Sequence, residues 1–229
     1  MSYISYCLIY GDLMFDYFKA RQHMVDCQIR TADVTNYALL KAFSSVDREK
    51  FVPSEYAAIA YGETNIHLGK DRYLLEPRVF AKMLELLKVN SNDLVLDIGC
   101  GFGYSSAVLS QISEVVIALE EEFFFQNAQK LLSETSIENT VIYEGNLSDG
   151  INYDEKVDAL IIQGGIETIP SKIQEQVKDG GRIVAIFLAG AKGECRIGIK
   201  KTNGIDWNYG FDAYAPLLSD FSIEKKFIF

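Results

Sequence analysis

The sequence is poor in histidine, in paired cysteines and in positive charge. It has two histidines, His23 and His67, among 229 residues. Its cysteines lie far apart, without a C-x-x-C pair: Cys7, Cys27, Cys100 and Cys195. This spacing provides neither a local metal-binding motif nor a disulfide framework, so we expect no metal and free thiols in a reducing compartment.

The shortage of positive charge bears on possible partners. With 22 Lys and Arg against 32 Asp and Glu, the formal net charge is −10. Dense basic patches that could follow a phosphate backbone are missing, so nucleic acid is not an expected partner. The apolar N-terminus "MSYISYCLIYGDLMF" is too short to span a bilayer and has no Lys or Arg before position 19. We therefore predict no membrane association and a soluble cytoplasmic protein.

The composition that is present fits a folded chain, since hydrophobic residues make up 48% and charges are spread along the length. We treat residues 1–13 as an N-terminal extension, because Met14 is a possible start, and residues 14–229 as a single domain. Within that domain we expect a helical layer with a substrate loop over 14–76 and a sheet core over 77–229. Helices are predicted at 14–28, from an N-cap at Thr35, and at 55–60, with 62–76 irregular.

Beyond Pro77, a helix "RVFAKMLELL" leads into short apolar runs that alternate with helical segments. The predicted strands cover 94–98, 115–119, 141–143, 157–162 and 182–187, with two or three more near 195–200, 205–209 and 223–229. The predicted helices cover 104–111, 121–132 and 171–177. Such alternation predicts an α/β fold, a doubly wound, mostly parallel seven-stranded Rossmann-like sheet with right-handed crossovers. Ligands bind such sheets beyond the carboxyl ends of the strands.

The segment "LDIGCGFGY" is the strongest candidate for a ligand site. Its glycines are Gly99, Gly101 and Gly103, whereas a dinucleotide fingerprint needs its third glycine where Tyr104 stands. Asp97 would repel a pyrophosphate but attract an ammonium or sulfonium group. This pattern favours S-adenosyl-L-methionine over a nicotinamide cofactor. The alternative is a tight strand-to-helix turn capped by Asp97.

Two later segments support a nucleoside. Glu120 ends the next predicted strand, 19 residues after Gly101, where a carboxylate can accept hydrogen bonds from both ribose hydroxyls. Glu121 and Glu122 can instead be favourable charges in the first turn of a helix. In "EGNLSDG", Asn146 could bond the adenine amino group. We therefore predict a cofactor-binding domain of the methyltransferase class.

The chain resembles the protein-L-isoaspartate O-methyltransferase family from about residue 22 to 190. The matching segments are "MVDCQIR", "REKFVPSEYAAIAY", "LDIGCGFGYSSAVLS", "VIYEGN" and "VKDGGRIV". The resemblance implies methyl transfer from S-adenosyl-L-methionine to the carboxylate of isoaspartyl residues in damaged proteins. Together with our reading of the loop, it gives these candidate cofactor-binding residues: Asp97, Gly99, Cys100, Gly101, Gly103, Tyr104, Glu120, Glu121, Gly145 and Asn146. The family usually has aspartate where Asn146 stands.

The chain departs from the family just before Pro77. Family members have Gly-Gln-Thr-Ile-Ser-Gln-Pro, and this chain has "DRYLLEP". Leu75 replaces the serine regarded as catalytic and Tyr73 replaces the threonine, so no catalytic residue can be assigned. A carboxylate acceptor is already ionised at neutral pH, so the reaction needs placement and desolvation rather than a general base. The candidate substrate-binding residues are Arg72, Tyr73, Leu74 and Leu75.

Each candidate also has a plainer explanation. Arg72 and Arg78 can be solvated surface charges, Tyr73 can be packing, and His67 a loop histidine with local bonds. Three other residues stay open at this point: Gln28 and Arg30, which reach the active site or brace the N-terminal helices, and Gln163, which follows a strand. The C-terminal "GFDAYAPLLSDFSIEKKFIF" is either a closing strand or a cover over the site.

The acceptor is open as well. It is a peptide or protein with isoaspartyl residues, a small carboxylic acid, or another protein side chain. A non-catalytic relative that binds the cofactor is a further alternative. The sequence does not settle the oligomeric state.

Overall fold

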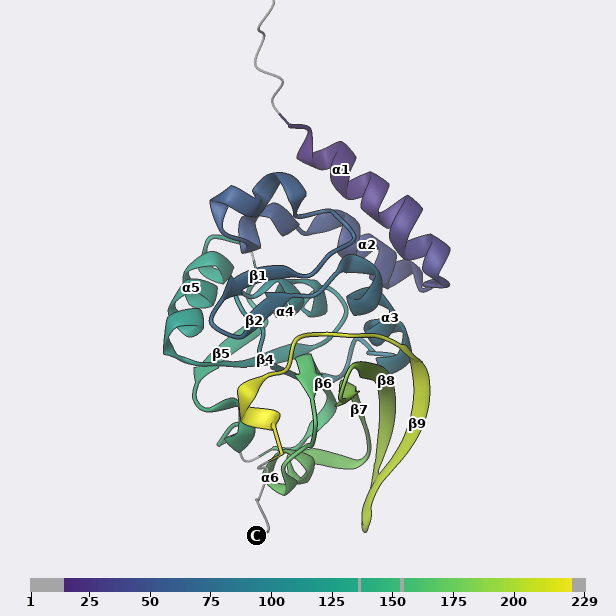
Figure 1. Cartoon of the computed structure of the whole chain (residues 1–229). Helices are drawn as coiled ribbons and strands as arrows, with labels where there is room; N and C mark the ends of the chain where they lie inside the picture. The colour runs from purple at the N-terminus through teal and green to yellow at the C-terminus, as the bar shows by residue number, and fades with distance from the viewer. Residues whose placement is uncertain (1–14, 136, 153–154, 224–229) are drawn as a thin grey trace, which may run out of the picture.

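The computed structural model describes residues 15–135, 137–152 and 155–223, and its centre is a seven-stranded sheet (Figure 1). The strand order is β5-β4-β3-β6-β7-β8-β9. The strands are β3 (Leu94–Ile98), β4 (Val115–Glu120), β5 (Thr140–Glu144), β6 (Val157–Ile166), β7 (Val177–Ala189), β8 (Lys192–Lys201) and β9 (Gly204–Asp212). Pairing is parallel from β5 to β7 and antiparallel for β8 and β9. The predicted doubly wound, mostly parallel sheet is confirmed.

Both faces of the parallel strands are buried, as their nearly continuous apolar sequences predict. On one face, Val95 and Val116 pack with α3 (Pro77–Leu87), α4 (Tyr104–Leu109) and the N-terminal helices. On the other face, Leu96 and Leu160 pack with Ile173 of α6 (Ser171–Glu175). Pro77 occupies the first position of α3, where its missing N–H costs no helical hydrogen bond.

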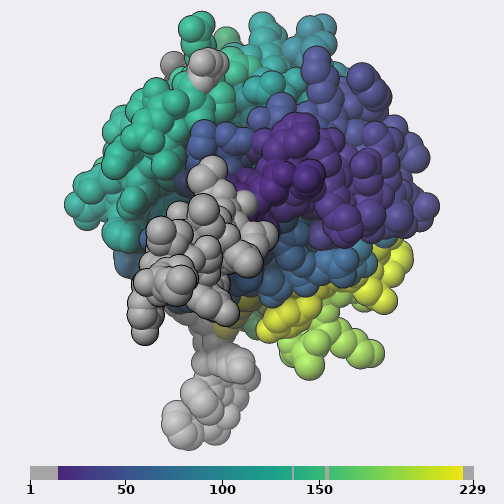
Figure 2. All heavy atoms as spheres, turned by 90° about the horizontal axis from the view of Figure 1, so that it is seen from above, coloured from purple at the N-terminus to yellow at the C-terminus, as the bar shows by residue number. Residues whose placement is uncertain are grey.

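The N-terminal helical layer lies at the top of Figure 1, above the hairpin and the sheet. It comprises α1 (Tyr17–Met24), the π-helix η1 (Val25–Ile29), the 3-10 turn η2 (Arg30–Ala32), α2 (Tyr37–Ser45), and the 3-10 helices η3 (Arg48–Phe51) and η4 (Ser54–Ile59). Seen from above in Figure 2, these purple and blue segments form much of the visible face. The predicted N-cap of α2 is wrong by one residue. Asn36 is the cap and accepts from the Ala38 N–H at 2.9 Å, while the Thr35 hydroxyl bonds Glu85 instead.

Residues 62–76 are not wholly irregular, contrary to the expectation from sequence. Strands β1 (Ile66–Gly69) and β2 (Arg72–Leu74) form an antiparallel hairpin that is separate from the main sheet. The turn is made by Lys70 (φ 43°) and Asp71, and Gly69 (φ 121°) leads into it. Strands of three or four residues give too short an alternation to stand out from a loop in sequence. The hairpin lies between the N-terminal helices and the sheet (Figure 1).

Several other boundaries differ from the predictions. Strands β6 and β7 run longer than expected, and the register shifts between them show bulges that local hydrophobicity does not reveal. Helix α5 spans Glu122–Ser133, one residue later than predicted. The strand predicted at 223–229 falls almost entirely outside the described residues, and Ile223 itself is not in a strand.

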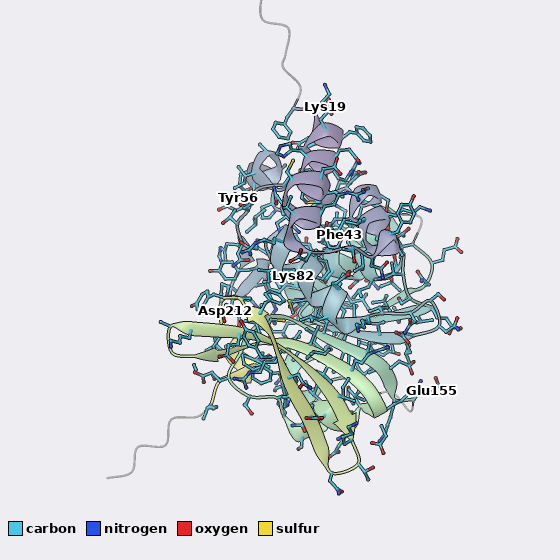
Figure 3. The ribbon with its side chains drawn as sticks, turned by 90° about the vertical axis from the view of Figure 1, so that its right-hand side faces the viewer. Lys19, Phe43, Tyr56, Lys82, Glu155 and Asp212 are labelled. Atoms are coloured by element: carbon cyan, nitrogen blue, oxygen red, sulfur yellow. The ribbon has the colours of Figure 1, made fainter. Side chains whose placement is uncertain are left out.

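The C-terminal segment begins in the last residues of β9. Strand β9 closes the sheet edge, and the chain then crosses to the 3-10 turn η6 (Ser219–Phe221) in front of β6 (Figure 1). Leu217 forms a bridge with Gly165, at the carboxyl end of β6. Figure 3 shows Asp212, at the end of β9, near Lys82 of α3. The Lys82 ammonium lies 4.7 Å from the centre of the Phe211 ring.

Strands β3 and β6 mark the point where the chain order reverses, since β4 and β5 follow on one side and β7 on the other. In open α/β sheets the ligand crevice lies at such a switch point, outside the carboxyl ends of the strands. Among the described residues, no helix is both long and apolar enough to cross a membrane.

Candidate active site

The glycine loop between β3 and α4 has the backbone conformation that its sequence predicts. Gly99, Gly101 and Gly103 have φ values of 77°, 60° and 96°, in the left-handed region that L side chains avoid. The Gly103 N–H closes the turn onto the Cys100 carbonyl at 2.9 Å. The loop therefore forms a tight turn without side chains at these three positions, at the carboxyl end of β3, and neighbouring side chains such as Leu68 pack against it.

Asp97, at the end of β3, is buried at 0% exposure and bonded on both oxygens. Its Oδ2 accepts from the Ser105 and Ser106 hydroxyls at 2.6 Å each, and its Oδ1 accepts from Gln163 Nε2 at 2.9 Å. Burial raises the pKa of Asp97, and these three donors oppose the rise. The side chain thus ties the start of α4 and strand β6 to β3; a direct contact with a cofactor stays a prediction.

Glu120, at the end of β4, is also buried at 0% exposure, yet its carboxylate faces the glycine loop. It accepts from the Gly101 N–H at 2.7 Å and from the Glu121 N–H at 3.0 Å. Burial raises the pKa of Glu120 to about 7, against the lowering effect of Arg72 and of these N–H groups. The strand-end acid and the glycine loop are therefore in direct contact.

Arg72 of β2 is buried at 1% exposure, and the expectation of a solvated surface charge is wrong. Its Nε lies 3.1 Å from both carboxylate oxygens of Glu120. Its other nitrogens lie 2.5 Å from Asp71 and 3.3 Å from Glu121, and the guanidinium stacks 5.5 Å from the Phe124 ring centre. Three acids together neutralise this buried cation. Arg78, by contrast, is exposed and pairs with Glu76.

The remaining residues of the substrate segment point in different directions. The Leu75 side chain is buried in the core, and its carbonyl accepts from Arg48 Nη2 at 2.6 Å. Leu74 is buried as well, while Tyr73 is half-buried and packs 4.9 Å from the His67 ring. Arg72 is the only charged residue among the four candidate substrate-binding residues, and it contacts Glu120, which in turn bonds the glycine loop.

The other predicted cofactor residues lie at the same edge of the sheet. Asn146 caps the 3-10 turn η5 (Leu147–Asp149), and its Oδ1 accepts from the Ser148 N–H at 3.1 Å. The Gly145 N–H donates to the Glu120 carbonyl at 3.0 Å. Cys100 is buried in the loop, and burial raises the pKa of its thiol. The Tyr104 side chain packs into the core, away from the loop, so only its backbone could contact a cofactor there.

Other candidate residues have structural partners. Gln28 donates to the Tyr61 carbonyl at 2.8 Å, and Arg30 pairs with Asp26 on the surface. His67 is exposed and bonds the Lys70 carbonyl at 2.8 Å. Gln28 and Arg30 therefore brace the N-terminal layer, and His67 belongs to the hairpin turn.

Sequence reasoning missed four residues that build the site. Ser105 and Ser106 hold Asp97, and Arg48 holds the substrate segment. Leu218, from the C-terminal segment, packs at Gly164 and Gly99. The pair of serines just after the loop is a signal that could have been found. Arg48 and Leu218 contact residues far from them in the sequence, so no local sequence pattern predicts these contacts.

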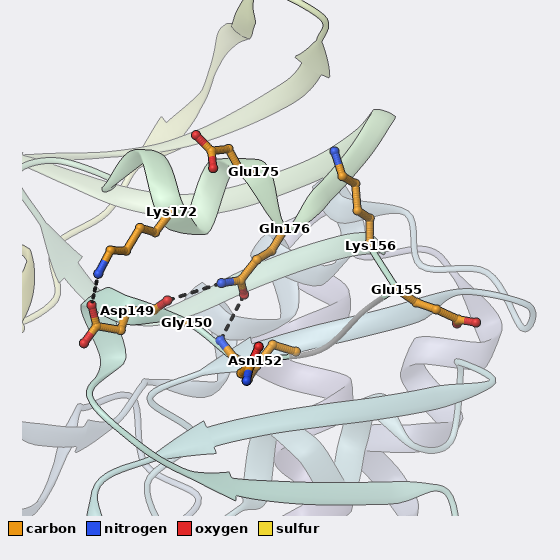
Figure 4. Close-up of a pocket in the computed structure, with 9 residues that line it drawn as sticks. Asp149, Gly150, Asn152, Glu155, Lys156, Lys172, Glu175 and Gln176 are labelled. Carbon is orange, nitrogen blue, oxygen red and sulfur yellow. Dashed lines mark hydrogen bonds and ion pairs between the residues drawn. The ribbon is translucent and has the colours of Figure 1, made fainter.

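A separate surface pocket of about 460 Å³ lies around Asp149, Lys172 and Gln176 (Figure 4). Its polar groups bond one another: Lys172 pairs with Asp149 at 2.7 Å, and Gln176 bonds the Ile151 N–H at 3.0 Å. These pairs are structural, and the catalytic candidates do not line this pocket.

A doubly wound sheet with this strand order, a glycine loop after β3 and an acid at the end of β4 defines the S-adenosyl-L-methionine-dependent methyltransferase class. A sequence model of the protein-L-isoaspartate(D-aspartate) O-methyltransferase family matches residues 19–203, most of the chain. The chain belongs to this family. The resemblance seen in the sequence is confirmed.

Relatives of known name agree with this assignment. Protein-L-isoaspartate O-methyltransferase 2 of Shewanella sediminis is 34% identical over 73% of this chain and 69% of its own length. The protein-L-isoaspartate O-methyltransferase of Opitutus terrae is 32% identical over 80% and 81%. A solved Plasmodium falciparum structure, described as such an enzyme in complex with S-adenosyl-L-homocysteine, matches with a TM-score of 0.73 at 16% identity. That match covers 89% of this chain and 98% of the other.

The residues present fit the cofactor of this class, but two side chains, those of Leu68 and Arg72, lie against the parts that would bind it. The positive-φ glycines carry no side chains of their own, and Glu120 lies against the loop through its bond from the Gly101 N–H; ribose binding by Glu120 stays a prediction. Leu68 of β1 nevertheless lies against the loop, since a Cβ on Gly101 would be 2.6 Å from its Cδ1. Arg72 already holds the Glu120 carboxylate.

Proposed function

We propose that this chain is an S-adenosyl-L-methionine-dependent methyltransferase that methylates the carboxylate of isoaspartyl residues in damaged proteins. The observation that carries the proposal is the contact between Glu120 and the Gly101 N–H at 2.7 Å, which joins the strand-end acid to the glycine loop. Relatives named for this activity, 32–34% identical over 73–80% of the chain, support the choice of acceptor.

Each part of the site has a proposed task. The loop Gly99–Gly103, with Cys100 and Tyr104, supplies backbone for the amino acid end of the cofactor, and Asp97 fixes that loop. Glu120 accepts from the ribose hydroxyls, flanked by Glu121, and the Gly145–Asn146 turn borders the adenine. When bound, S-adenosyl-L-methionine supplies a methyl group on a cationic sulfur, which an ionised carboxylate accepts without proton transfer.

The chain's contribution is then to hold and desolvate the acceptor carboxylate. Leu75 cannot donate a hydrogen bond, and its side chain is buried in the core. We assign that task to Arg72, whose planar fork suits a carboxylate, and to backbone N–H groups of the 73–75 segment. The loss of one neutral hydrogen bond costs about 0.5–1.5 kcal/mol, which weakens a site of this kind without abolishing it.

The test is methyl transfer from radiolabelled S-adenosyl-L-methionine to an isoaspartyl peptide, with the aspartyl isomer as the matched control. We expect labelling of the isoaspartyl peptide alone, as a base-labile methyl ester. Equal, background-level labelling of both peptides would overturn the proposal.

One observation favours a different acceptor as the second candidate. Tyr73 and Leu75 stand where the family has hydroxyl residues, so the acceptor pocket has lost two side-chain donors. A small carboxylic acid, or another protein side chain, is then the alternative. The same assay with free carboxylic acids in place of the peptide distinguishes it.

The proposed partners are therefore a protein or peptide substrate and the cofactor. We expect the protein to act in the cytoplasm, where the exposed Cys27 and the buried Cys100 and Cys195 would stay reduced.

A further inference from the structure

Three N–H donors already bond the Glu120 carboxylate in this structure, which leaves it too few acceptor positions for two more hydroxyls. Its oxygens accept from Arg72 Nε, which lies 3.1 Å from both, from the Gly101 N–H and from the Glu121 N–H. An ionised carboxylate offers about four acceptor positions. Two ribose hydroxyls therefore cannot bond this carboxylate while Arg72 remains in place.

The hairpin that carries Arg72 also covers the glycine loop. Leu68 of β1 lies so close to Gly101 that a Cβ there would be 2.6 Å from its Cδ1, and Gly69 lies near the Phe124 ring. A second attachment holds the hairpin at its turn: Asp71 Oδ2 accepts from the Ser219 N–H at 3.0 Å and from its hydroxyl at 2.7 Å. Side chains thus fix the hairpin at both the loop and the C-terminal segment.

The backbone of the hairpin is free of the main sheet. Strands β1 and β2 pair with each other in a separate two-stranded sheet, with a register shift between His67 and Gly69. Two-stranded hairpins are marginally stable alone and depend on side-chain contacts for their position. The position of the hairpin therefore depends on the bonds of Arg72 and Asp71 and on the packing of Ile66, Leu68 and Leu74, which are buried in the core.

Arg72 also keeps one donor without a hydrogen-bond partner. Its Nη2 is buried and forms no hydrogen bond, although Glu121 lies 3.3 Å away. A buried donor left unbonded carries a free-energy cost, so the closed position is only partly satisfied. The ion pairs with Glu120, Asp71 and Glu121 thus hold Arg72 in place while this one donor makes no hydrogen bond.

We propose that the β1–β2 hairpin is a lid that Arg72 locks over the cofactor site, and that the cofactor's ribose hydroxyls displace Arg72 from Glu120 on binding. This inference rests on the proposed function for the identity of the ligand, and it goes beyond it in stating how the site opens. Displacement leaves the guanidinium beside the Tyr73–Leu75 segment, where an acceptor carboxylate is its natural partner. The lid and the acceptor-binding residue are then the same side chain.

The experiment is calorimetric titration of S-adenosyl-L-homocysteine into the wild type, Arg72→Gln and Arg72→Lys. Arg196→Gln is the matched control, since Arg196 pairs with Glu194 on β8. A closed lid lowers the apparent affinity by the fraction of open molecules. We therefore expect Arg72→Gln to bind about 3- to 10-fold more tightly, Arg72→Lys to lie between it and the wild type, and Arg196→Gln to match the wild type. Unchanged or weaker binding by Arg72→Gln would overturn the proposal.

Hydrogen exchange followed by mass spectrometry supplies a second readout that needs no activity. Residues 66–74 should exchange faster in unliganded Arg72→Gln than in the wild type, and S-adenosyl-L-homocysteine should accelerate their exchange in the wild type. Slower exchange of the hairpin on ligand binding would show a lid that closes over the ligand, and would overturn the proposal. If Arg72→Gln does not fold, Ser219→Ala, which loosens the exposed attachment to Asp71, is expected to act in the same direction on both readouts.

These outcomes separate the lid from the proposed function. Tighter binding by Arg72→Gln with no methylation of the isoaspartyl peptide by the wild type would support the lid and defeat the proposed acceptor. Methylation by the wild type with weaker binding by Arg72→Gln would do the reverse. If the wild type and Arg72→Gln both fail to bind S-adenosyl-L-homocysteine, displacement of Arg72 by this ligand is excluded.

Discussion

Asp97 and Gln163 join the two strands at the centre of the sheet, with Gln163 Nε2 donating to Asp97 Oδ1 at 2.9 Å. Asp97 lies on β3 and Gln163 on β6, the strands between which the chain order reverses. The two serine hydroxyls on Asp97 Oδ2 complete the set of donors. The aspartate at the head of the glycine loop is thus the structural link between the loop, the next helix and the neighbouring strand.

Removing that link should destabilise the fold. Asp97→Ala leaves three buried donors without their acceptor, and an unsatisfied buried polar group costs about 1–3 kcal/mol. We expect the free energy of unfolding, from urea titration, to fall by at least that amount. Asp206→Ala, at an exposed position of β9, should change it by less than about 0.5 kcal/mol. Equal effects of the two substitutions would contradict the account.

Arg48 should hold the substrate segment through its two carbonyl bonds. It is fully buried, it donates to the Ala60 and Leu75 carbonyls at 2.6 Å each, and it lies 4.8 Å from the Tyr104 ring centre. Arg48→Met fills much of the volume but leaves both carbonyls without this donor. We expect a loss of about 1–3 kcal/mol in unfolding free energy.

Faster hydrogen exchange over residues 73–76 should accompany that loss. Arg48→Lys, which keeps a cationic donor but not the planar guanidinium, should lose less stability than Arg48→Met. A variant Arg48→Met as stable as the wild type, with unchanged exchange, would show that these bonds do not position the segment.

Gly101 should resist substitution for two separable reasons. Its φ of 60° costs an L residue about 1–2 kcal/mol, and a Cβ would also crowd Leu68. We therefore expect Gly101→Ala to cost more in the wild type than in a Leu68→Ala background, where the backbone cost alone remains. A double-mutant cycle on unfolding free energies measures the difference. The same cost in both backgrounds would show that Leu68 does not press on the loop.

The buried Glu120 should give stability a pH dependence. Burial raises its pKa from 4.5 to about 7, so in that range the folded chain holds a proton that the unfolded chain has released. Folding therefore gains stability from this group below pH 4.5 and loses it as the pH rises through about 7. We expect the stability of the wild type to fall relative to that of Glu120→Gln between these values. Parallel pH profiles in urea unfolding would contradict the assignment.

The sequence predicted those features that depend on neighbouring residues. The spacing of Gly99, Gly101 and Gly103 predicted a tight turn after a strand, and the alternation of apolar runs predicted the sheet. Glu120 could be found because parallel strands bring their carboxyl ends to one edge. The glycine loop and the strand that ends in Glu120 can therefore be recognised from short segments of the sequence.

The position of the β1–β2 hairpin could not be predicted in this way. Arg72 and Glu120 are 48 residues apart, and Asp71 and Ser219 are 148 apart. A lone arginine in a polar stretch is usually solvated, and the alternation of a three-residue strand is too brief to register. Only the three-dimensional structure shows that the Arg72 guanidinium forms ion pairs with three acidic residues.

Glu120 as the ribose-binding carboxylate is the centre of the account, and paired affinities test it most directly. S-adenosyl-L-homocysteine and its 2′-deoxy analogue are titrated into the wild type and Glu120→Gln, and the ratio of the two dissociation constants is compared between the proteins. A hydrogen bond to a charged group contributes about 1.5–3 kcal/mol. The wild type should therefore prefer the ribonucleoside by roughly 10- to 100-fold, and Glu120→Gln should lose most of that preference. An equal preference in both proteins would show that the ribose hydroxyls bond elsewhere.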